Sequence, residues 1–166
     1  YAEVLGGDVN SGGQRNSGTM TAPNSDAVQR CIKNAVQNSN IKPEDIDAIN
    51  GHLTATSKDF TEIENWSKAL DLKGNDFPYI NSLKSLVGHC LSAAGAIESV
   101  ASVLQVHHGF IFPNINCEDL NEEITALISE QKIPQTIIEK DISIVAKASF
   151  GFGDVNGCVI YKKYKN

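Results

Sequence analysis

Apolar and polar positions follow two different periods in the first quarter of the chain. Residues 1–5 read as a short strand, and residues 6–23, rich in Gly, Ser, Asn and Thr, read as a loop. Asn24 is a suitable N-cap for the helix that follows. Apolar residues then recur at spacings of three and four, at Ala27, Val28, Cys31, Ile32, Ala35 and Val36. The pattern predicts an amphipathic helix with a single apolar stripe.

The middle of the chain repeats this alternation of short apolar runs and helical patterns. Pro43-Glu44-Asp45 suits a helical turn, and residues 46–49 read as the next strand. Asp59 is a plausible N-cap with Glu62 three residues later, which is the spacing of a capping box. The buried face of the helix that it would start is made by Phe60, Ile63, Trp66 and Leu70. A further short strand is predicted over residues 77–80.

A second and more apolar helix is predicted over residues 91–107, with Gly109 ending it. Its apolar positions are Leu91, Ala94, Ile97, Ala101 and Leu104, and Val100 and Val103 widen the stripe. Because the stripe is so wide, we expect this helix to be deeply buried.

Two closing strands are predicted over residues 142–148 and 157–161, with Gly151 and Gly153 in the turn between them. Strands that alternate with helices indicate an α/β fold, and a terminal hairpin makes the sheet mixed rather than purely parallel. The sequence therefore predicts a mixed β-sheet covered by helices.

Composition and charge narrow the possible functions. The chain has 166 residues, of which 41% are hydrophobic and 20% charged, as in one globular domain. A net charge of −6 argues against a nucleic-acid partner. No apolar run approaches the roughly 18–20 residues of a membrane span, so no membrane partner is expected. The opening at Tyr1 has no initiator Met or signal peptide, which indicates a piece of a longer protein.

The cysteines give no sign of a metal site. Cys31, Cys90, Cys117 and Cys158 lack the spacings of zinc ligands, alone or with histidine. Cys31 and Cys158 fall on apolar positions and are expected to be buried free thiols, which favours a cytoplasmic location.

His52 is the first candidate for chemistry. It follows the strand predicted over residues 46–49, and functional residues of α/β sheets gather at the carboxyl ends of strands. Thr54, Thr56 and Ser57 follow it with hydroxyl groups. Taken alone, the segment favours a loop histidine with a structural hydrogen bond over a catalytic one.

His89 is the second candidate, at the start of the predicted apolar helix. A helix N-terminus disfavours imidazolium, and a neutral imidazole is able to donate a hydrogen bond to a developing oxyanion. A histidine that only fixes the turn is the alternative. Lys84 precedes it and taken alone is a surface lysine. Glu98 stands among apolar residues of the helix, and if it is buried, Lys84 is its candidate partner.

The aromatic and glycine residues at 150–153 predict a tight turn whose rings either line a pocket or fill the core. Phosphate-binding glycine loops are absent, and so is the GxSxG elbow of a Ser/His/Asp hydrolase.

Three segments, taken together and in this order, resemble the C-terminal half of beta-ketoacyl-acyl carrier protein synthases, condensing enzymes of the thiolase-like superfamily. Residues 50–56 are similar to the family's Asn-x-His-Gly-Thr-x-Thr segment, and residues 84–89 to its Lys-x-x-x-Gly-His segment. Residues 149–153 match its Ser-Phe-Gly-Phe-Gly segment. Residues 93–99 and 108–116 also resemble the family pattern, so the resemblance covers essentially the whole chain.

The resemblance implies that residues 1–166 form a C-terminal beta-ketoacyl synthase domain, the second half of a thiolase-like fold. The half with the nucleophilic cysteine would precede it. The implied reaction is decarboxylative Claisen condensation of malonyl-carrier protein with an enzyme-bound acyl thioester, in fatty acid or polyketide elongation. No cofactor is implied, because the substrates ride on the phosphopantetheine of acyl carrier protein. The implied partners are that carrier protein, the chain's own N-terminal half and a second subunit, in a homodimer or heterodimer.

The resemblance also assigns catalytic roles. His52 and His89 would stabilise the enolate oxyanion, and Lys84 would hold the local network. Glu62 and Glu98 resemble the family's buried acidic partners, which orient this network.

Substrate-binding roles follow in the same way. Thr54 and Thr56 would hydrogen-bond the pantetheine arm. The backbone N–H of Phe152 would join the oxyanion hole for the acyl thioester, and its side chain resembles the family's gate to the acyl pocket. Phe150 would wall off the decarboxylation site.

Leu53, Val87, Ala148 and Asp154 differ from the family pattern, which indicates a divergent member with a non-standard substrate. Two other interpretations stay open. The chain is either part of a non-catalytic partner subunit, like the chain-length factor of some condensing systems, or an unrelated α/β binding domain. The upstream cysteine separates the first of these from a synthase.

Overall fold

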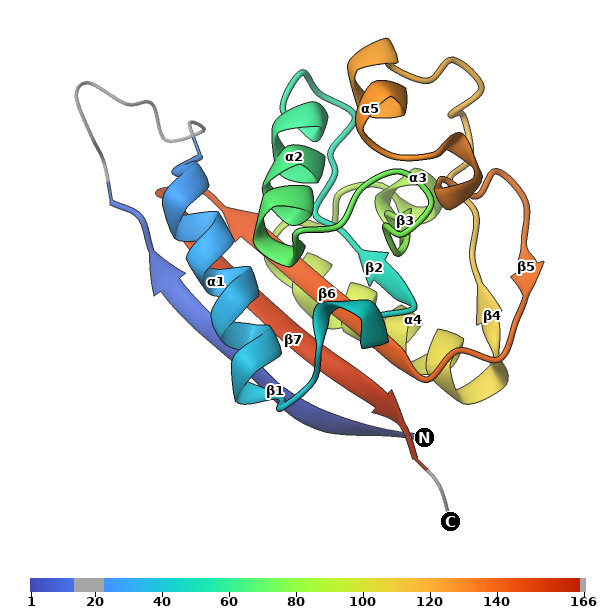
Figure 1. Ribbon diagram of the computed structural model, residues 1–166, viewed down its shortest axis with the longest axis horizontal. Helices are drawn as coiled ribbons and strands as arrows, with labels where there is room; N and C mark the ends of the chain where they lie inside the picture. The colour runs from blue at the N-terminus through green and yellow to red at the C-terminus, as the bar shows by residue number, and fades with distance from the viewer. Residues whose placement is uncertain (14–22, 165–166) are drawn as a thin grey trace.

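A computed structural model describes residues 1–13 and 23–164 of the chain. In these residues a five-stranded sheet has the order β1-β7-β6-β2-β3 (Figure 1). The β1–β7 and β7–β6 pairs are antiparallel, and the β6–β2 and β2–β3 pairs are parallel. The five strands are β1 (Ala2–Ser11), β2 (Ala48–Asn50), β3 (Tyr79–Asn81), β6 (Ile144–Gly151) and β7 (Val155–Lys163). The predicted mixed sheet with a closing hairpin is confirmed.

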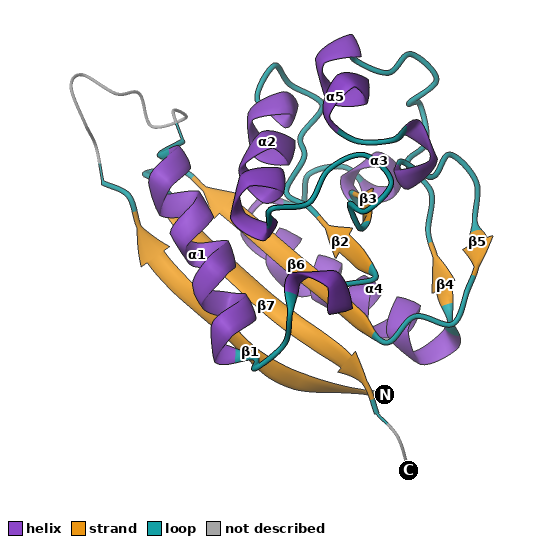
Figure 2. Cartoon of the chain, viewed as in Figure 1, coloured by secondary structure: helices purple, strands orange, loops and turns teal. Residues whose placement is uncertain are grey.

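Helices lie on both faces of this sheet (Figure 2). They are α1 (Ser25–Asn38), α2 (Asp59–Leu70), α3 (Lys84–Val87), α4 (Ala94–His108) and α5 (Glu122–Leu127), with short 3₁₀ helices η1 (Pro43–Asp45), η2 (Leu91–Ala93) and η3 (Glu130–Lys132). A small second sheet pairs β4 (Phe110–Ile111) with β5 (Ile138–Glu139). No helix among the described residues is long and apolar enough to cross a membrane.

The first strand is longer than the sequence predicted. The expected loop was to begin at Gly6, yet β1 continues to Ser11 and pairs with β7 along its whole length, with an irregularity between Val4 and Gly6. A Cβ atom on Gly7 would lie 2.5 Å from the carbonyl oxygen of Cys158. Glycine is used here to let two backbones approach closely, and not to make a turn. The remainder of the predicted loop, residues 14–22, lies outside the described residues.

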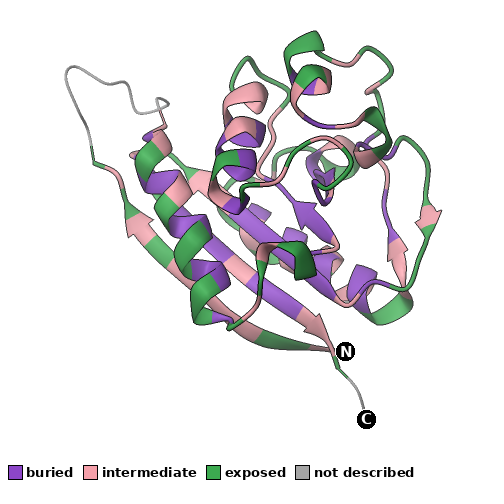
Figure 3. Cartoon of the chain, in the orientation of Figure 1, coloured by how far each residue is buried: buried purple, intermediate pink, exposed green. Residues whose placement is uncertain are grey.

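Helix α1 confirms its predicted cap and face. The Asn24 side chain accepts a hydrogen bond from the Ala27 N–H at 3.3 Å. The six predicted stripe residues are all buried: Ala27, Val28, Cys31, Ile32, Ala35 and Val36. With α2 they cover the apolar face of the sheet, where Ile49, Ile80 and Ala146 are buried (Figure 3). Cys31 and Cys158 are free and buried, as expected.

Helix α4 packs with a different side from the one predicted, and of the predicted stripe only Ala94 is buried. Leu91, in η2, is 69% exposed, and Ile97 and Val100 on α4 are 40% and 60% exposed. The residues that face the sheet are mostly polar, namely Ala94, Glu98, Ser102, Gln105 and Val106. The prediction of a deeply buried apolar stripe is therefore wrong, although the helix ends at Gly109 as expected.

The reason lies in the strands beneath α4. Asn50 donates to the Ser102 hydroxyl at 3.0 Å, and Asn81 donates to the Gln105 side-chain oxygen at 2.9 Å. These side chains point to the face of the sheet opposite the apolar core. Because buried amides require hydrogen-bond partners, α4 turns its polar residues toward the sheet. We name this layer the polar seam: Asn50, Asn81, Ser102 and Gln105.

Candidate functional site

His52 lies in the loop that leaves the carboxyl end of β2, and Glu62 of α2 holds this loop. The Glu62 carboxylate accepts the backbone N–H of His52 at 2.7 Å and that of Leu53 at 2.9 Å. A Cβ atom on Gly51 would lie 2.9 Å from the same carboxylate, so the approach depends on glycine at that position. Glu62 therefore fixes the backbone under the imidazole.

The capping box predicted for α2 is wrong. Asp59 is the first residue of the helix, and Lys58 takes the N-cap position without a side-chain hydrogen bond. The Asp59 carboxylate instead accepts the backbone N–H groups of Thr54 at 3.0 Å and Ala55 at 3.1 Å. Both acidic side chains of the first turn are thus directed to the His52 loop. A loop with several free N–H groups competes successfully for these carboxylates.

Thr54 and Thr56 end this loop with their hydroxyl oxygens 3.2 Å apart. Both residues line a cavity of about 580 Å³. Other residues of its wall include His52, Glu62, Asn65, His89, Phe150, Phe152 and Asn156. The predicted histidines, threonines and phenylalanines thus share one cavity.

His89 lies beside His52 in the wall of this cavity. It lies between α3 and η2, before the start of α4, so its predicted place at the start of the apolar helix is wrong. Its Nδ1 accepts the Leu91 N–H at 3.0 Å, which leaves Nε2 to carry the proton of the neutral ring. The His52 and His89 ring centroids are 5.5 Å apart, with planes at 83°.

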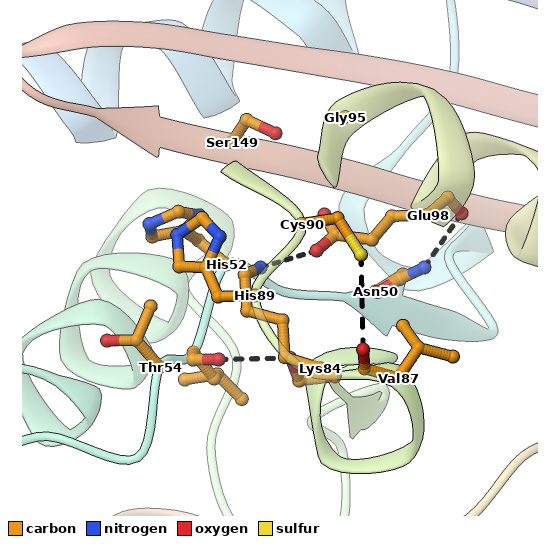
Figure 4. A network of polar contacts seen from close by, with 12 residues as sticks. Asn50, His52, Thr54, Lys84, Val87, His89, Cys90, Gly95, Glu98 and Ser149 are labelled. Atoms are coloured by element: carbon orange, nitrogen blue, oxygen red, sulfur yellow. Dashed lines mark hydrogen bonds and ion pairs between the residues drawn. The ribbon is translucent and has the colours of Figure 1, made fainter. Parts of the chain in front are cut away.

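A cluster of buried charged side chains lies next to the two histidines. Lys84 and Glu98 form an ion pair with Nζ–Oε1 at 2.5 Å, and their side chains are only 6% and 2% exposed. Figure 4 shows the Lys84 side chain extending toward Glu98 beside the imidazole rings. The sequence prediction that a buried Glu98 would pair with Lys84 is confirmed. The pairing satisfies a charge that would be expensive to bury alone.

Lys147 of β6 completes this cluster and is missing from the sequence-based candidates. Its Nζ lies 2.7 Å from Glu98 Oε2, and its side chain is 4% exposed. The signal was present, since a lysine stands in the middle of the apolar run predicted as a closing strand. A charged residue inside a central strand calls for a buried partner.

Burial and nearby charges set the protonation states of the His52 and Glu62 side chains. Burial and, after it, the Lys84 and Lys147 ammonium groups together lower the pKa of His52 to about 4, against the opposing effect of Glu98. Burial raises the pKa of Glu62 to about 7, against the hydrogen bond from the His52 N–H. His52 is therefore a neutral imidazole near pH 7. Among the described residues, its buried Nδ1 has no hydrogen-bond partner.

The turn between β6 and β7 closes the other side of the cavity. The Phe150 ring meets the His52 ring edge-on, with centroids 6.4 Å apart. Phe152, two residues later, is 64% exposed. The prediction placed Gly151 and Gly153 between the strands, whereas Gly151 ends β6 and only residues 152–154 form the turn. One phenylalanine is thus packed beside the histidines, and the other stands at the mouth of the cavity.

Comparisons with known proteins show the family of this chain. A family model described as the beta-ketoacyl synthase C-terminal domain matches residues 1–118. The 3-oxoacyl-[acyl-carrier-protein] synthase 1 of Escherichia coli K12 is 32% identical over all of this chain and 38% of its own length. The chloroplastic synthase II of Arabidopsis thaliana is 36% identical over 99% of this chain and 29% of its own. The chain spans about a third of the length of such relatives.

Solved structures give the same result. The ishigamide ketosynthase/chain length factor has a TM-score of 0.86 and 30% identity, covering 99% of this chain and 38% of that one. A type II PKS acyl-carrier protein in complex with its ketosynthase gives a TM-score of 0.78 and 27% identity, covering 99% of this chain and 39% of that one. The fold is therefore that of the C-terminal half of a thiolase-like ketosynthase.

Proposed function

Because this chain belongs to the beta-ketoacyl synthase family, as a C-terminal domain, we propose that it supplies the decarboxylation half of a beta-ketoacyl-acyl carrier protein synthase active site. The observation that carries the proposal is the adjacent pair His52 and His89 over a buried Lys84–Glu98 ion pair. The preceding half of the protein would provide the nucleophilic cysteine. The enzyme would be an acyltransferase of fatty acid or polyketide elongation.

The two imidazoles suit the charge that forms in this reaction. When malonyl thioester loses carbon dioxide, the electron pair of the broken C–C bond moves toward the thioester oxygen and gives an enolate. His89 Nε2–H and a neutral His52 would donate hydrogen bonds to that oxygen. The enolate carbon would then attack the acyl thioester, forming the new C–C bond and releasing the cysteine thiolate.

The remaining residues would hold the substrate. Thr54 and Thr56 would hydrogen-bond the pantetheine arm, since both line the cavity. The Phe152 backbone N–H would join the N–H of the cysteine in the oxyanion hole of the acyl thioester. The exposed Phe152 ring would act as a gate, and Phe150, whose ring contacts His52, would act as a wall.

We infer that the protein uses no cofactor, because the thioester of phosphopantetheine already activates the malonyl carbon. Its partners would be acyl carrier protein, its own N-terminal half and a second subunit. The ketosynthase neighbours with a carrier protein and with a chain length factor support this proposal. A cytoplasmic location is proposed from the buried free thiols Cys31 and Cys158.

The experiment that tests the function is the intact mass of the full-length protein after incubation with an acyl carrier protein thioester. We expect a gain of one acyl group that is lost when a single upstream cysteine is replaced. A folded protein that gains no acyl group would contradict the proposal. That result would favour the second candidate, a chain-length-factor-like partner subunit, which the ketosynthase/chain length factor neighbour also supports.

The isolated 166-residue chain is expected to be inert in condensation and to self-associate. It lacks the proposed cysteine half, and its α4 face exposes Ile97 and Val100. Exposed apolar patches of this kind drive association. Sedimentation over a range of concentrations measures it, and Val100→Lys is expected to reduce it. A monomer at all concentrations, or measurable condensation, would contradict the expectation.

A further inference from the structure

Lys147 is the buried charged group that the proposed mechanism does not use. Residues 145, 147 and 149 of β6 point to the α4 face of the sheet, opposite the apolar core. The Lys147 Nζ forms an ion pair with Glu98 at 2.7 Å and donates to the Ser149 hydroxyl at 2.8 Å. It also donates to the backbone carbonyl of Ala148. The ammonium group is therefore held on three sides.

Within the ion-paired residues the charges do not cancel, and the other carboxylate near both lysines, Glu62, offsets the second ammonium group only in part near pH 7, because burial raises its pKa to about 7. Glu98 brings one carboxylate from α4, whereas Lys84 and Lys147 bring two ammonium groups from α3 and β6. One lysine is sufficient to neutralise Glu98. A second buried lysine is expensive to keep, so a merely structural position would be better filled by an apolar residue of similar size. The excess positive charge therefore points to a use beyond pairing.

The His52 imidazole responds to the charge of both lysines. Several charged or titratable groups surround this ring. They are Lys84 on α3, Lys147 on β6, Glu98 on α4, His89 beside the ring, and Glu62 on α2, which accepts the His52 backbone N–H. Neither lysine lines the cavity, so both act on the ring from behind. A positive charge behind an imidazole disfavours a second positive charge on the ring.

We propose that Lys147 is a second positioning lysine of this site, which grips Glu98 opposite Lys84 and keeps His52 uncharged. This inference rests on the proposed function, since it specifies how the same site is tuned. An imidazolium at position 52 would attract the malonyl carboxylate and stabilise the group that has to leave as carbon dioxide. A neutral ring donates to the enolate oxygen without that stabilisation of the ground state.

Lys147 also connects this cluster to the phenylalanine turn. Its hydrogen bond to Ser149 reaches the residue directly before Phe150, whose ring packs edge-on to His52. The Lys147 side chain thus contacts both the Glu98 carboxylate and the end of β6 next to His52. Charge and geometry at His52 are expected to change together when Lys147 is replaced.

The test is the pKa of His52 in the full-length protein, measured by NMR with ¹³C-labelled histidine and assigned with a His52→Gln variant. In Lys147→Met we expect this pKa to rise by about one unit, the low end of the effect of one neighbouring charge. Lys147→Arg keeps the charge and is expected to restore the wild-type value. Decarboxylation near pH 5, normalised to its rate near pH 7.5, is expected to fall about twofold in Lys147→Met, since about half of His52 is then charged.

A His52 pKa that is unchanged in folded Lys147→Met would overturn the inference, as would a wild-type His52 that titrates near 6.5. If Lys147→Met does not fold, Lys147→Gln removes the charge while keeping a donor for Ser149, and the same criterion applies. The NMR titration does not require turnover. A folded protein that transfers no acyl group would therefore contradict the proposed function. A His52 pKa that does not change in Lys147→Met would contradict the role of Lys147, and the two results are independent.

Discussion

His89→Ala is expected to slow malonyl decarboxylation and condensation by the full-length protein about 10²–10³-fold, which is the usual effect of removing one donor to an oxyanion. The ring is anchored through Nδ1 to the Leu91 N–H, so its other nitrogen is presented to the cavity in a fixed direction. Alanine leaves the enolate oxygen with the His52 donor alone. Radiolabelled carbon dioxide release from malonyl-carrier protein measures the first step by itself.

The matched control is His108→Ala, the same change on an exposed histidine at the end of α4. We expect it to leave the rate within about twofold of wild type, because an exposed residue outside the site has little effect. Unchanged condensation in His89→Ala would remove this histidine from the mechanism. Equal losses in the two variants would indicate a general defect in folding.

Glu98→Ala is expected to destabilise the full-length protein by about 3–5 kcal/mol, the range found when one partner of a buried ion pair is removed. Two lysines, Lys84 and Lys147, would lose their common carboxylate while remaining almost inaccessible to water. Their ammonium groups repel each other in a medium that screens charge poorly. Chemical denaturation followed by circular dichroism measures the loss.

Glu64→Ala is the control for this prediction, since Glu64 pairs with Lys68 at 2.8 Å on the surface of α2. Exposed pairs of this kind contribute about 0.2–1 kcal/mol. A Glu98→Ala protein as stable as Glu64→Ala would mean that water reaches the cluster in solution. A substantial difference between the two variants would confirm that burial sets the energy of the Glu98 pairs.

Local rules were sufficient where one face of an element meets water and the other meets an apolar core. Helix α1 is the clearest case, because the period of its stripe and the Asn24 cap both appear unchanged in the structure. The closing hairpin was predicted from two apolar runs separated by glycine, although its first strand, β6, is buried on both faces. His52 and His89 were also identified from the sequence as candidate site residues, because each lies in a short, recognisable segment.

The same rules failed where polarity is buried. Helix α4 was assigned to the wrong face, since the period of apolar residues says nothing of a strand that offers Asn50 and Asn81 as partners. The capping-box prediction was wrong because the Asp59 and Glu62 carboxylates accept backbone N–H groups of the His52 loop instead. Lys147 was overlooked because its partner, Glu98, lies on α4, and β4, α5, η3 and β5 come between α4 and β6 in the chain. Polar contacts made outside each element decided all three outcomes.

The polar seam has a consequence for how this sequence can change over evolutionary time. An apolar contact tolerates many substitutions of similar volume, one at a time. The pairs Asn50–Ser102 and Asn81–Gln105 are different, because a change in one member removes a buried side-chain hydrogen bond from the other and leaves it only a backbone partner. Single substitutions at these positions are therefore expected to be rarer than in the apolar core. These hydrogen bonds hold α4, the helix that carries Glu98, in one register. The apolar contacts on the opposite face of the sheet tolerate single substitutions of similar volume.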